Sequence, residues 1–564
     1  MDSFFCWIVS QIDLGSLKRE GYAMRFCGAL LLLVFLSPSA AFSSASQRPN
    51  IVYVMADDLG YGDVKSFGGD RSRIETPHFD RMAREGLRFT DAHAVAAVCV
   101  PSRMAIMTGR YPWRFAAPEP GGPWGFLGLR FSPDTFTLAD LLKQAGYHTG
   151  YVGKWHLGTR MVTRDGLVQG LDNVDYTKPL EVGPPQYGFD DSFILPGSLD
   201  MYPYVFVRDN HFVGRVTKQR GWSAFNRVGP TEETFEDYKV LDTFSKEMEA
   251  FIGERADAAK KGTPFFLYFA LTAPHTPTSP SPRWRGRSRL GLYGDFVMEV
   301  DDCLGRVMRA LEEYGLEENT LVIATSDHGA ASYAGNIEKA TVKQYESMQA
   351  LGHYSSAHFR GFKFSIYEGG RRVPFVVRWP AVVAGGGVCD RLIGLQDIFA
   401  TVADVAGLEL QSKQGVDSVS LRPLFEAPDG APVRSSMIQS SVRSWAVRDG
   451  KWKLCLCPGS GCTGRWGNSP PQDEAYRNAL EAFGRRPERA DLLKAPFVQL
   501  FNLEEDPTES VNLAAREPAR VAAMVRMFEV QFAAGRSTPG ESVDNDRTSL
   551  DPLAGVPKFV REVR

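Results

Sequence analysis

The sequence has little net charge, few cysteines and no hydrophobic run long enough to cross a bilayer. Its 564 residues contain 64 Lys and Arg against 67 Asp and Glu, a formal net charge of -3, which argues against a general nucleic-acid-binding protein. The apolar run Ala29–Leu36 is too short to span a membrane. We therefore expect no nucleic-acid partner and no stable membrane anchor.

The same short run fits the core of a secretory signal peptide. Met24–Arg25 precedes it, and small residues over 39–45 offer cleavage sites. We assign 1–45 to a leader and expect an exported mature protein, whether secreted, periplasmic or lysosome-like according to the host. Residues 1–23 lack a clean signal pattern, so a true start at Met24 stays open.

The few cysteines agree only loosely with export. Cys6 and Cys27 would be lost with the leader. Three of the others, Cys455, Cys457 and Cys462, flank a Pro-Gly-Ser-Gly turn, where a local disulfide between two of them is one alternative. A zinc site is less favoured, because the spacing gives three ligands and no histidine lies near. The pairing among these three cysteines stays open.

The most informative cysteine is Cys99, in the segment Val98–Arg110 (Val-Cys-Val-Pro-Ser-Arg-Met-Ala-Ile-Met-Thr-Gly-Arg). Pro101 suits the first turn of a helix and Gly109 its end, so we expect a short helix beginning just after Cys99. The thiol then lies beside unpaired backbone N–H groups, which favour anions and lower a thiol's pKa. Arg103 follows about one turn later, and its planar guanidinium group can donate several hydrogen bonds to the same place. Together these features indicate a site for a tetrahedral oxyanion.

Three interpretations of Cys99 compete. A small buried hydrophobe is the usual fate of a free cysteine. A thiolate phosphatase requires an arginine six positions further on, and Ala105 stands there. The third is the pattern Cys-x-Pro-Ser-Arg followed by Thr-Gly-Arg, which resembles the signature of the sulfatase family. In that family the cysteine is oxidised after translation to formylglycine.

Buried runs alternate with helical segments from residue 50 onward. Strands are predicted at Asn50–Ala56, Pro264–Leu271 and Leu321–Thr325, and within Tyr147–Gly158 before a polar loop. Helices are predicted at Thr76–Gly86, Thr137–Ala145 and Asp301–Tyr314. This alternation predicts an α/β fold with a mostly parallel sheet sandwiched by helices. We assign the catalytic domain to 46–430.

The pattern changes after about Phe425. Short strands at Ser444–Val447, Lys451–Leu456 and Leu500–Leu503 precede a helix at Glu517–Ala533. They predict a smaller antiparallel α+β subdomain over 431–535, followed by a mobile tail over 536–564. Two aperiodic stretches, Trp113–Pro133 and Pro203–Glu233, are predicted to be long loops, which in compact enzymes often surround a site.

Acidic residues follow two of the predicted buried strands. Asp57 and Asp58 come after the first strand, and Asp327 and His328 after another. Because the carboxyl ends of parallel strands share one edge, we expect these side chains to meet there. Carboxylates brought together repel unless a proton or cation lies between them, and oxygen-rich sites favour calcium or magnesium. A solvated turn is the alternative for either pair alone.

Three further residues carry chemistry near predicted strand ends. Lys154 and His156 lie two apart, so an extended segment would point both the same way. Lys154 can neutralise an anion, and His156 can move a proton near neutral pH. His275, between Pro274 and Pro277, follows another strand and should face the same edge. A packed or surface histidine is the alternative for His275.

The resemblance to sulfatases extends well beyond Cys99. Matching blocks occur in the family's order at Asn50–Gly60, Glu75–Arg110, Gly150–Gly158, Pro264–Pro277, Asn319–Gly329, Arg360–Pro380, Ala446–Leu454 and Gln499–Leu513. They cover nearly everything from Arg48 to about Ala533. The whole resembles the arylsulfatase A or N-acetylgalactosamine-6-sulfatase type, which implies an alkaline-phosphatase-like fold and hydrolysis of sulfate monoesters on a carbohydrate.

The resemblance also implies a role for each site residue. Calcium, with magnesium less favoured, would be bound by Asp57, Asp58, Asp327 and His328. Cys99, matured to formylglycine by a formylglycine-generating or sulfatase-maturating enzyme, would attack sulfur as the hydrate and form a covalent sulfo-enzyme intermediate. Arg103 would orient the hydrate. Sulfate would be held by Lys154, Ser198 and Lys363. His275 would protonate the leaving alcohol, and His156 would take the remaining hydroxyl proton.

Some features depart from the family or leave alternatives open. His328 stands where the family most often has asparagine, and imidazole is a softer ligand than an amide oxygen. A phosphoester hydrolase of the same superfamily often needs a second metal on an Asp-x-x-x-His pair, but Asp301 and Asp302 lack that histidine. A non-catalytic glycan-binding homologue would have lost site residues, and none is lost. Pro282–Arg289 fits either a charged loop or a grip on a polyanionic glycan.

Overall fold

A ten-stranded sheet in the order β13-β2-β12-β11-β1-β10-β4-β5-β6-β7 organises the main part of the chain. The structure is a computed structural model that describes residues 48–221, 226–333, 347–441, 444–461 and 496–547. The parallel strands at the centre are β11 (Thr320–Ser326), β1 (Asn50–Asp57), β10 (Phe265–Pro274), β4 (His148–Lys154) and β5 (Asp191–Leu195). The flanking strands are β13 (Gly387–Cys389), β2 (Leu87–Phe89), β12 (Phe375–Arg378), β6 (Val207–Arg208) and β7 (His211–Phe212). The sheet is mixed and mostly parallel, as predicted.

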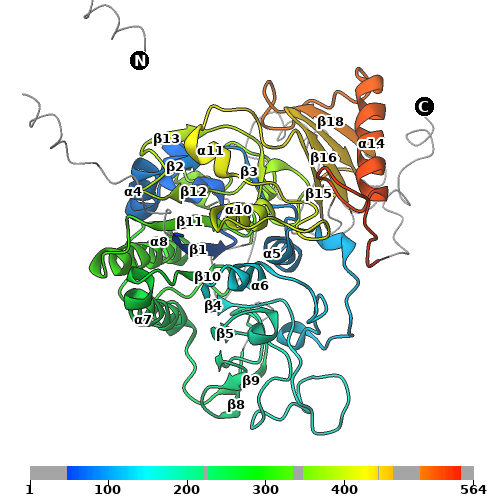
Figure 1. Ribbon diagram of the computed structural model, residues 1–564. Helices are drawn as coiled ribbons and strands as arrows, with labels where there is room; N and C mark the ends of the chain where they lie inside the picture. Colours follow the sequence, from blue (N-terminus) through cyan, green and yellow to red (C-terminus); the bar gives the residue numbers. More distant parts are fainter. Residues whose placement is uncertain (1–47, 222–225, 334–346, 442–443, 462–495, 548–564) are drawn as a thin grey trace, which may run out of the picture. The chain divides into compact units, whose positions relative to one another are not determined.

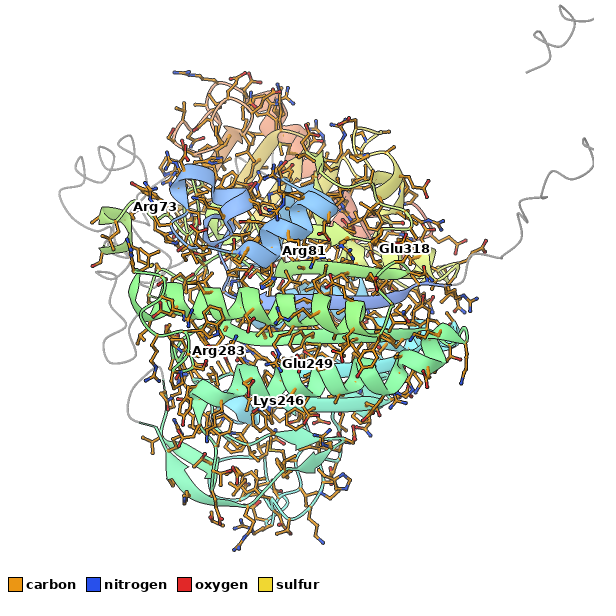
Figure 2. The ribbon with its side chains drawn as sticks, turned by 90° about the vertical axis from the view of Figure 1, so that its left-hand side faces the viewer. Arg73, Arg81, Lys246, Glu249, Arg283 and Glu318 are labelled. Atoms are coloured by element: carbon orange, nitrogen blue, oxygen red, sulfur yellow. The ribbon has the colours of Figure 1, made fainter. Side chains whose placement is uncertain are left out.

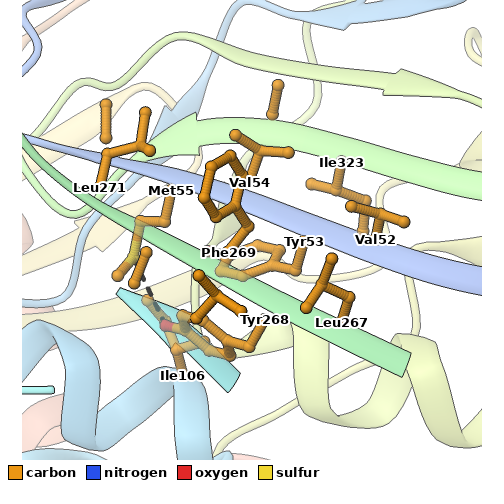
Figure 3. Close-up of a cluster of buried hydrophobic side chains, with 14 of the residues drawn as sticks. Val52, Tyr53, Val54, Met55, Ile106, Leu267, Tyr268, Phe269, Leu271 and Ile323 are labelled. Atoms are coloured by element: carbon orange, nitrogen blue, oxygen red, sulfur yellow. Dashed lines mark hydrogen bonds between the residues drawn. The ribbon is translucent and has the colours of Figure 1, made fainter. Parts of the chain in front are cut away.

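The continuous apolar runs form the central strands because both of their faces are buried. Every residue of β1, β10 and β11 is buried. Tyr53 and Tyr268 pack edge to face at 5.0 Å between ring centroids, and Figure 3 shows them among Leu267, Phe269 and Ile106. This core fixes the strand ends that carry the acidic residues.

Helices cover both faces of the sheet, as Figure 1 shows. One layer holds α4 (Pro77–Glu85), α7 (Val240–Lys260) and α8 (Gly291–Glu313), and Figure 2 shows α7 and α8 side by side. The other holds α5 (Cys99–Thr108), α6 (Leu138–Gln144) and α10 (Asp397–Val405). Helix α8 begins ten residues before the predicted Asp301. Gly291 and Gly294 lower the helix propensity of its first turns, but the burial of Tyr293 and Phe296 against the core stabilises them.

The C-terminal part forms a second, antiparallel sheet. Its strands are β15 (Ser436–Ser440), β16 (Trp445–Asp449), β17 (Trp452–Leu456) and β18 (Val498–Asn502), and α14 (Pro518–Ala533) packs on it. This is the expected small α+β unit, with β15 as an unpredicted strand. Cys455 and Cys457 are both free thiols, and Cys462 lies outside the described residues.

Shorter elements complete the described chain. They are α3 (Lys65–Gly68), β3 (Ala92–His93), β8 (Val216–Arg220), β9 (Gly229–Glu232), β14 (Ile393–Gly394), α11 (Arg422–Glu426), and the 3-10 turns η1 (Tyr61–Asp63), η2 (Gly69–Arg71), η3 (Pro112–Arg114), η4 (Trp124–Phe126), η5 (Pro184–Tyr187), η6 (Asp237–Lys239) and η7 (Glu368–Gly370). The predicted loop Trp113–Pro133 contains short 3-10 turns. The prediction of a loop over Pro203–Glu233 is wrong in part, because this stretch contains β6 and β7 of the main sheet and the antiparallel pair β8–β9. Within the described ranges, no helix has the length and hydrophobicity needed to cross a membrane.

The ends of the chain are described only in part. The leader predicted over 1–45 lies outside the described residues, as does 548–564. In the predicted tail, Asn545 accepts a hydrogen bond of 2.9 Å from Arg114, and Thr538 donates one of 2.8 Å to Val416 O. Residues 536–547 therefore contact the rest of the chain, whereas the mobility of the tail stays a prediction.

Candidate active site

The parallel pairing of β1 and β11 brings the two acidic strand ends together. Ala56 pairs with Ser326, so the residues that follow each strand emerge at the same edge. The Asp58 backbone N–H donates to Asp327 Oδ1 at 3.2 Å, and Ser102 of α5 donates to Asp327 O at 2.6 Å. Asp57, Asp58 and Asp327 are completely buried, and one oxygen of each lies within 4.8 Å of the others.

Three permanent cations surround these three carboxylates. Lys154 Nζ lies 2.6 Å from Asp57 Oδ2, and Lys363 Nζ lies 2.8 Å from Asp58 Oδ1. Arg103 lies 3.1 Å from Asp327 Oδ2 and 3.5 Å from Asp57 Oδ1. Asp57 Oδ1 nevertheless accepts no hydrogen bond. A buried carboxylate oxygen without a donor is what a cation site requires.

Burial and the local charges move the pKa values of Asp57 and Asp58 in opposite directions. Burial raises the pKa of Asp57, but Lys154, His275 and Arg103 outweigh burial and bring that pKa well below its usual range. For Asp58, burial dominates and raises the pKa, although Lys363 and His275 oppose it. Asp57 is therefore the more firmly ionised of the pair.

His328 faces the carboxylates through one ring nitrogen. Its Nδ1 lies 2.9 Å from Gly329 O, so Nδ1 carries a hydrogen and Nε2 is directed at the cluster. Nε2 lies 3.3 Å from Asp58 Oδ1. Burial lowers the pKa of His328, but Asp327, Cys99 and Asp58 raise it to about 9. A neutral His328 would present the Nε2 lone pair to a cation held by the same carboxylates.

Cys99 is the first residue of α5, one position earlier than predicted. Val98 is the N-cap and Gly109, at φ 62°, ends the helix in the left-handed conformation. The Cys99 Sγ lies 3.3 Å from His328 Nε2 and 3.5 Å from Lys363 Nζ. Burial raises the pKa of the thiol, but Lys154 and Lys363 outweigh it and lower the pKa. The thiol therefore faces the same cluster.

Lys154 and His156 reach the site by a different path from the one the spacing predicted. Strand β4 ends at Lys154, and His156 has φ 54°, so the two residues do not share one extended segment. Gly153 at φ 126° leaves no room for a side chain, because a Cβ there would lie 1.7 Å from Ala270 O. Burial, Lys154 and Arg103 hold the pKa of His156 well below its usual range.

His275 and Ser198 lie beyond the ends of β10 and β5, the two strands that flank β4 in the sheet. His275 follows β10, and its Nε2 lies 3.8 Å from Asp58 Oδ2. Burial first, then Lys363, lowers the pKa of His275. Ser198 follows β5, is fully buried, and its hydroxyl has no hydrogen-bond partner. Both side chains are thus available to a bound molecule.

The sequence reasoning missed Asp200, which lies between the site and the predicted loops. Asp200 Oδ2 accepts a 2.5 Å hydrogen bond from Arg227, whereas Oδ1 lies 4.0 Å from His275 Nδ1 and accepts none. A signal was present. Asp200 stands two residues after Ser198, just beyond the carboxyl end of β5, where the argument used for Asp57 also applies.

Asp301, considered in the sequence as part of a second metal site, has a structural role. Its Oδ1 accepts a 2.8 Å hydrogen bond from the Phe79 backbone N–H and its Oδ2 accepts one of 3.1 Å from that of His78. These donors belong to the first turn of α4. The carboxylate therefore satisfies the start of a helix.

Comparison with known proteins agrees with this arrangement. The Sulfatase family model matches residues 49–408. An N-acetylgalactosamine-6-O-sulfatase of Bacteroides thetaiotaomicron is 31% identical over 86% of this chain and 93% of its own length. The human N-acetylgalactosamine-6-sulfatase is 31% identical over 75% of this chain and 77% of its own. A solved structure from work on glycosaminoglycan metabolism by Bacteroides thetaiotaomicron has a TM-score of 0.71 at 29% identity, covering 86% of this chain and 99% of that one.

The family match covers more than half of the chain and includes every strand end that forms the site. Other similar proteins are named as arylsulfatase and steryl-sulfatase. The chain therefore belongs to the sulfatase family and is a sulfuric ester hydrolase.

Proposed function

We propose that this enzyme releases inorganic sulfate from a sulfated carbohydrate, with 6-sulfated N-acetylgalactosamine as the first substrate to test. The substrate comes from the names of the similar sulfatases. The observation that carries the proposal is the position of Cys99 at the start of α5, facing His328 and Lys363 beside three buried carboxylates.

The residues present fit a hard divalent cation. Calcium would be held by Asp57, Asp58, Asp327 and His328, and the unpartnered Asp57 Oδ1 supports this assignment. The bound ion would supply Lewis-acid polarisation of a sulfate oxygen. The three carboxylates are already matched by Arg103, Lys154 and Lys363. An added divalent cation therefore leaves an excess of positive charge, which suits the negative charge of a sulfate ester.

The remaining side chains orient the ester and move protons. Formylglycine in place of Cys99 would supply a hydrated aldehyde as the nucleophile. Arg103 approaches from α5 and Lys154 from β4, and Lys363 Nζ lies 3.5 Å from Cys99 Sγ. His275 Nε2 gives a proton to the leaving oxygen, while His156 Nδ1, buried without a hydrogen-bond partner, is free to accept one.

The maturation and export of the protein belong to the same proposal. A formylglycine-generating or sulfatase-maturating enzyme would act on the segment Val98–Arg110, and the leader over 1–45 would direct export. The decisive measurement is the mass of the proteolytic peptide that contains Cys99, taken from active protein. A mass matching aldehyde in place of thiol is expected. An intact thiol in active protein would contradict formylglycine catalysis.

Turnover is measured as sulfate released from N-acetylgalactosamine 6-sulfate by ion chromatography. Cys99→Ala is expected to abolish it while thermal unfolding stays close to that of the wild type. The matched control is Cys303→Ala. It removes a buried thiol of α8 whose sulfur accepts a 3.4 Å hydrogen bond from the Ser245 hydroxyl. Cys303→Ala should retain turnover. Equal rates for Cys99→Ala and wild type would exclude Cys99 as the nucleophile precursor.

A further inference from the structure

The histidine assigned to the leaving group, His275, has one hydrogen-bond acceptor and, further away, one carboxylate on the Nδ1 side of its ring. Thr276 O lies 2.5 Å from Nδ1, and Asp200 Oδ1 lies 4.0 Å from it. The opposite nitrogen, Nε2, faces Asp58 at 3.8 Å. A histidine with acceptors behind Nδ1 keeps a hydrogen on Nδ1 and directs Nε2 toward the reacting atoms.

Asp200 is held as a charged group with one free oxygen. Arg227 donates to Asp200 Oδ2 at 2.5 Å and to Asp200 O at 2.8 Å. Asp200 is 4% exposed, yet Oδ1 accepts no hydrogen bond. Burial raises the pKa of Asp200, but His275 and Arg227 together bring it below its usual range. A buried anionic oxygen without a donor is unfavourable unless it serves a neighbouring group.

Arg227 is itself fixed by an exposed tryptophan. The Arg227 guanidinium carbon lies 3.4 Å from the centroid of the Trp124 ring. Trp124 is 43% exposed and has φ 58°, a conformation that costs free energy for a bulky residue. The next residue, Gly125, donates to Tyr202 O at 3.0 Å and leaves no room there for a Cβ. The Trp124 turn is therefore clamped against the segment that carries Asp200.

We infer that Asp200 is a positioning residue for His275, and that Arg227, braced on Trp124, holds Asp200 in place for that task. This inference rests on the proposed function. As the nucleophile oxygen bonds to sulfur, the ester sulfur–oxygen bond breaks and its electron pair goes to the leaving oxygen. His275, protonated on both ring nitrogens for this step, gives its Nε2 proton to that oxygen and keeps the hydrogen on Nδ1. Asp200 fixes the ring so that Nε2 meets that oxygen. It takes no proton and contacts no reacting atom.

If Asp200 positions His275, its effect on kcat should depend on how strongly the leaving oxygen needs a proton. A sugar alkoxide leaves poorly and needs the proton, whereas 4-nitrophenolate leaves readily and needs it far less. The test compares the methyl glycoside of N-acetylgalactosamine 6-sulfate with 4-nitrophenyl sulfate. Asp200→Asn is expected to lower kcat on the sugar sulfate by about 10²-fold and to change KM by less than about threefold. The loss on the aryl sulfate should be at least about tenfold smaller.

Two further variants separate positioning from a general structural role. Asp200→Glu should recover part of kcat on the sugar sulfate, because the carboxylate is retained. Arg227→Met should show the same leaving-group pattern with a smaller loss. The matched control is Asp237→Asn, which removes another buried carboxylate bonded to an arginine, Arg220, at 3.1 Å. That control should affect both substrates alike.

Each outcome decides the inference. Equal losses on both substrates, or a loss confined to KM, would overturn it, and the second result would make Asp200 a sugar-binding group. If Asp200→Asn unfolds, the same comparison is made with Arg227→Met, which keeps both site residues. Failure of the proposed function looks different, because the wild-type enzyme would then release no sulfate from the sugar sulfate.

Discussion

Two largely buried ionic clusters with the same number of charges of each sign have different arrangements. Each combines three carboxylates with three permanent cations. The catalytic cluster is Asp57, Asp58, Asp327, Arg103, Lys154 and Lys363. The junction cluster, which joins the C-terminal sheet to η7, is Asp91, Glu368, Glu509, Arg372, Arg448 and Lys453. The number of charges therefore does not distinguish a candidate binding site from an ionic cluster that stabilises the fold.

In the junction cluster, cations lie between the carboxylates. Lys453 of β17 lies 2.9 Å from Glu368 Oε1 and 2.8 Å from Glu509 Oε1. Arg448 of β16 contacts both Glu368 and Asp91. Each acid is thus bridged to another through a lysine or arginine. Asp91, His93 and Glu368 also bring one atom each within 4.8 Å of the others, but Arg372 and Arg448 already pair with both of these acids.

In the catalytic cluster, the cations stand outside and the carboxylates converge. One oxygen from each aspartate lies within 4.8 Å of the other two, and Arg103 lies 3.5 Å from Asp57 Oδ1, which accepts no hydrogen bond. Asp91 Oδ1 and Glu509 Oε1 of the junction cluster accept none either, but Arg372 and Lys453 contact them directly. The cations Lys154 and Lys363 hold the outer oxygens. The centre between the three carboxylates would bind the proposed ion, and the surrounding cations would receive the anionic ester. Placement, and not composition, separates the two functions.

The largest expected effect is on activity when the catalytic cluster loses a cation. Lys154→Met removes a charge aimed at the sulfate, so kcat/KM should fall by about 10³-fold. The protein should remain folded, because Arg103 still lies 3.5 Å from Asp57. Steady-state kinetics and thermal unfolding measure the two effects. A large loss of stability with little loss of activity would remove the contrast between the clusters.

The same substitution in the junction cluster should act on stability. Lys453→Met leaves Glu368 and Glu509 buried and facing each other without the bridging charge, which costs about 3–5 kcal/mol of unfolding free energy. Urea unfolding measures this, and kcat per folded molecule should be unchanged. Lys451→Met is the control, since Lys451 pairs with Glu504 at the exposed surface and should alter stability far less. Similar losses of unfolding free energy for Lys453→Met and Lys451→Met would show that the junction cluster does not stabilise the fold.

The positions of the candidate site residues in the fold could be predicted in large part because most follow buried strands. The apolar run before Asp57 and the run before Asp327 place their carboxylates at one edge of a parallel sheet. Cys99 could be placed because Pro101 and Gly109 mark the ends of its helix. Local signals of this kind require no knowledge of contacts across the chain.

Contacts between distant segments could not be predicted in this way. Arg227 meets Asp200 and Trp124 because three separate segments pack together, and no periodicity in the loops encodes that packing. The turn at His156 was also missed, because a positive φ in a non-glycine residue overrides the alternation expected of a strand. The bridging role of Lys453 depends on contacts of β17 with η7 and with the loop after β18, which the sequence pattern does not carry.

Calcium provides a more discriminating test of the converging carboxylates. Calcium added to chelator-treated protein should raise the unfolding free energy by about 3 kcal/mol when its concentration is a hundred times Kd. Asp327→Asn should abolish this response, because one converging oxygen loses its charge. Glu509→Gln in the junction cluster should weaken the fold but retain the response. A calcium response that survives Asp327→Asn and disappears in Glu509→Gln would place the ion in the junction cluster and contradict the proposed site.

The smallest effect concerns Glu299 of α8, a buried carboxylate outside both clusters that accepts a 2.9 Å hydrogen bond from the Ser281 backbone N–H. Burial raises its pKa to about 7, above the value of an unfolded chain. The folded protein therefore binds more protons, and this contribution to stability is lost as pH rises through 7. Glu299→Gln should reduce the fall in unfolding free energy between pH 5 and 7 by about 1–2 kcal/mol. Urea unfolding at both pH values measures the change, with Asp302→Asn as control. Parallel profiles for wild type and Glu299→Gln would show that burial without a cation leaves this carboxylate ionised.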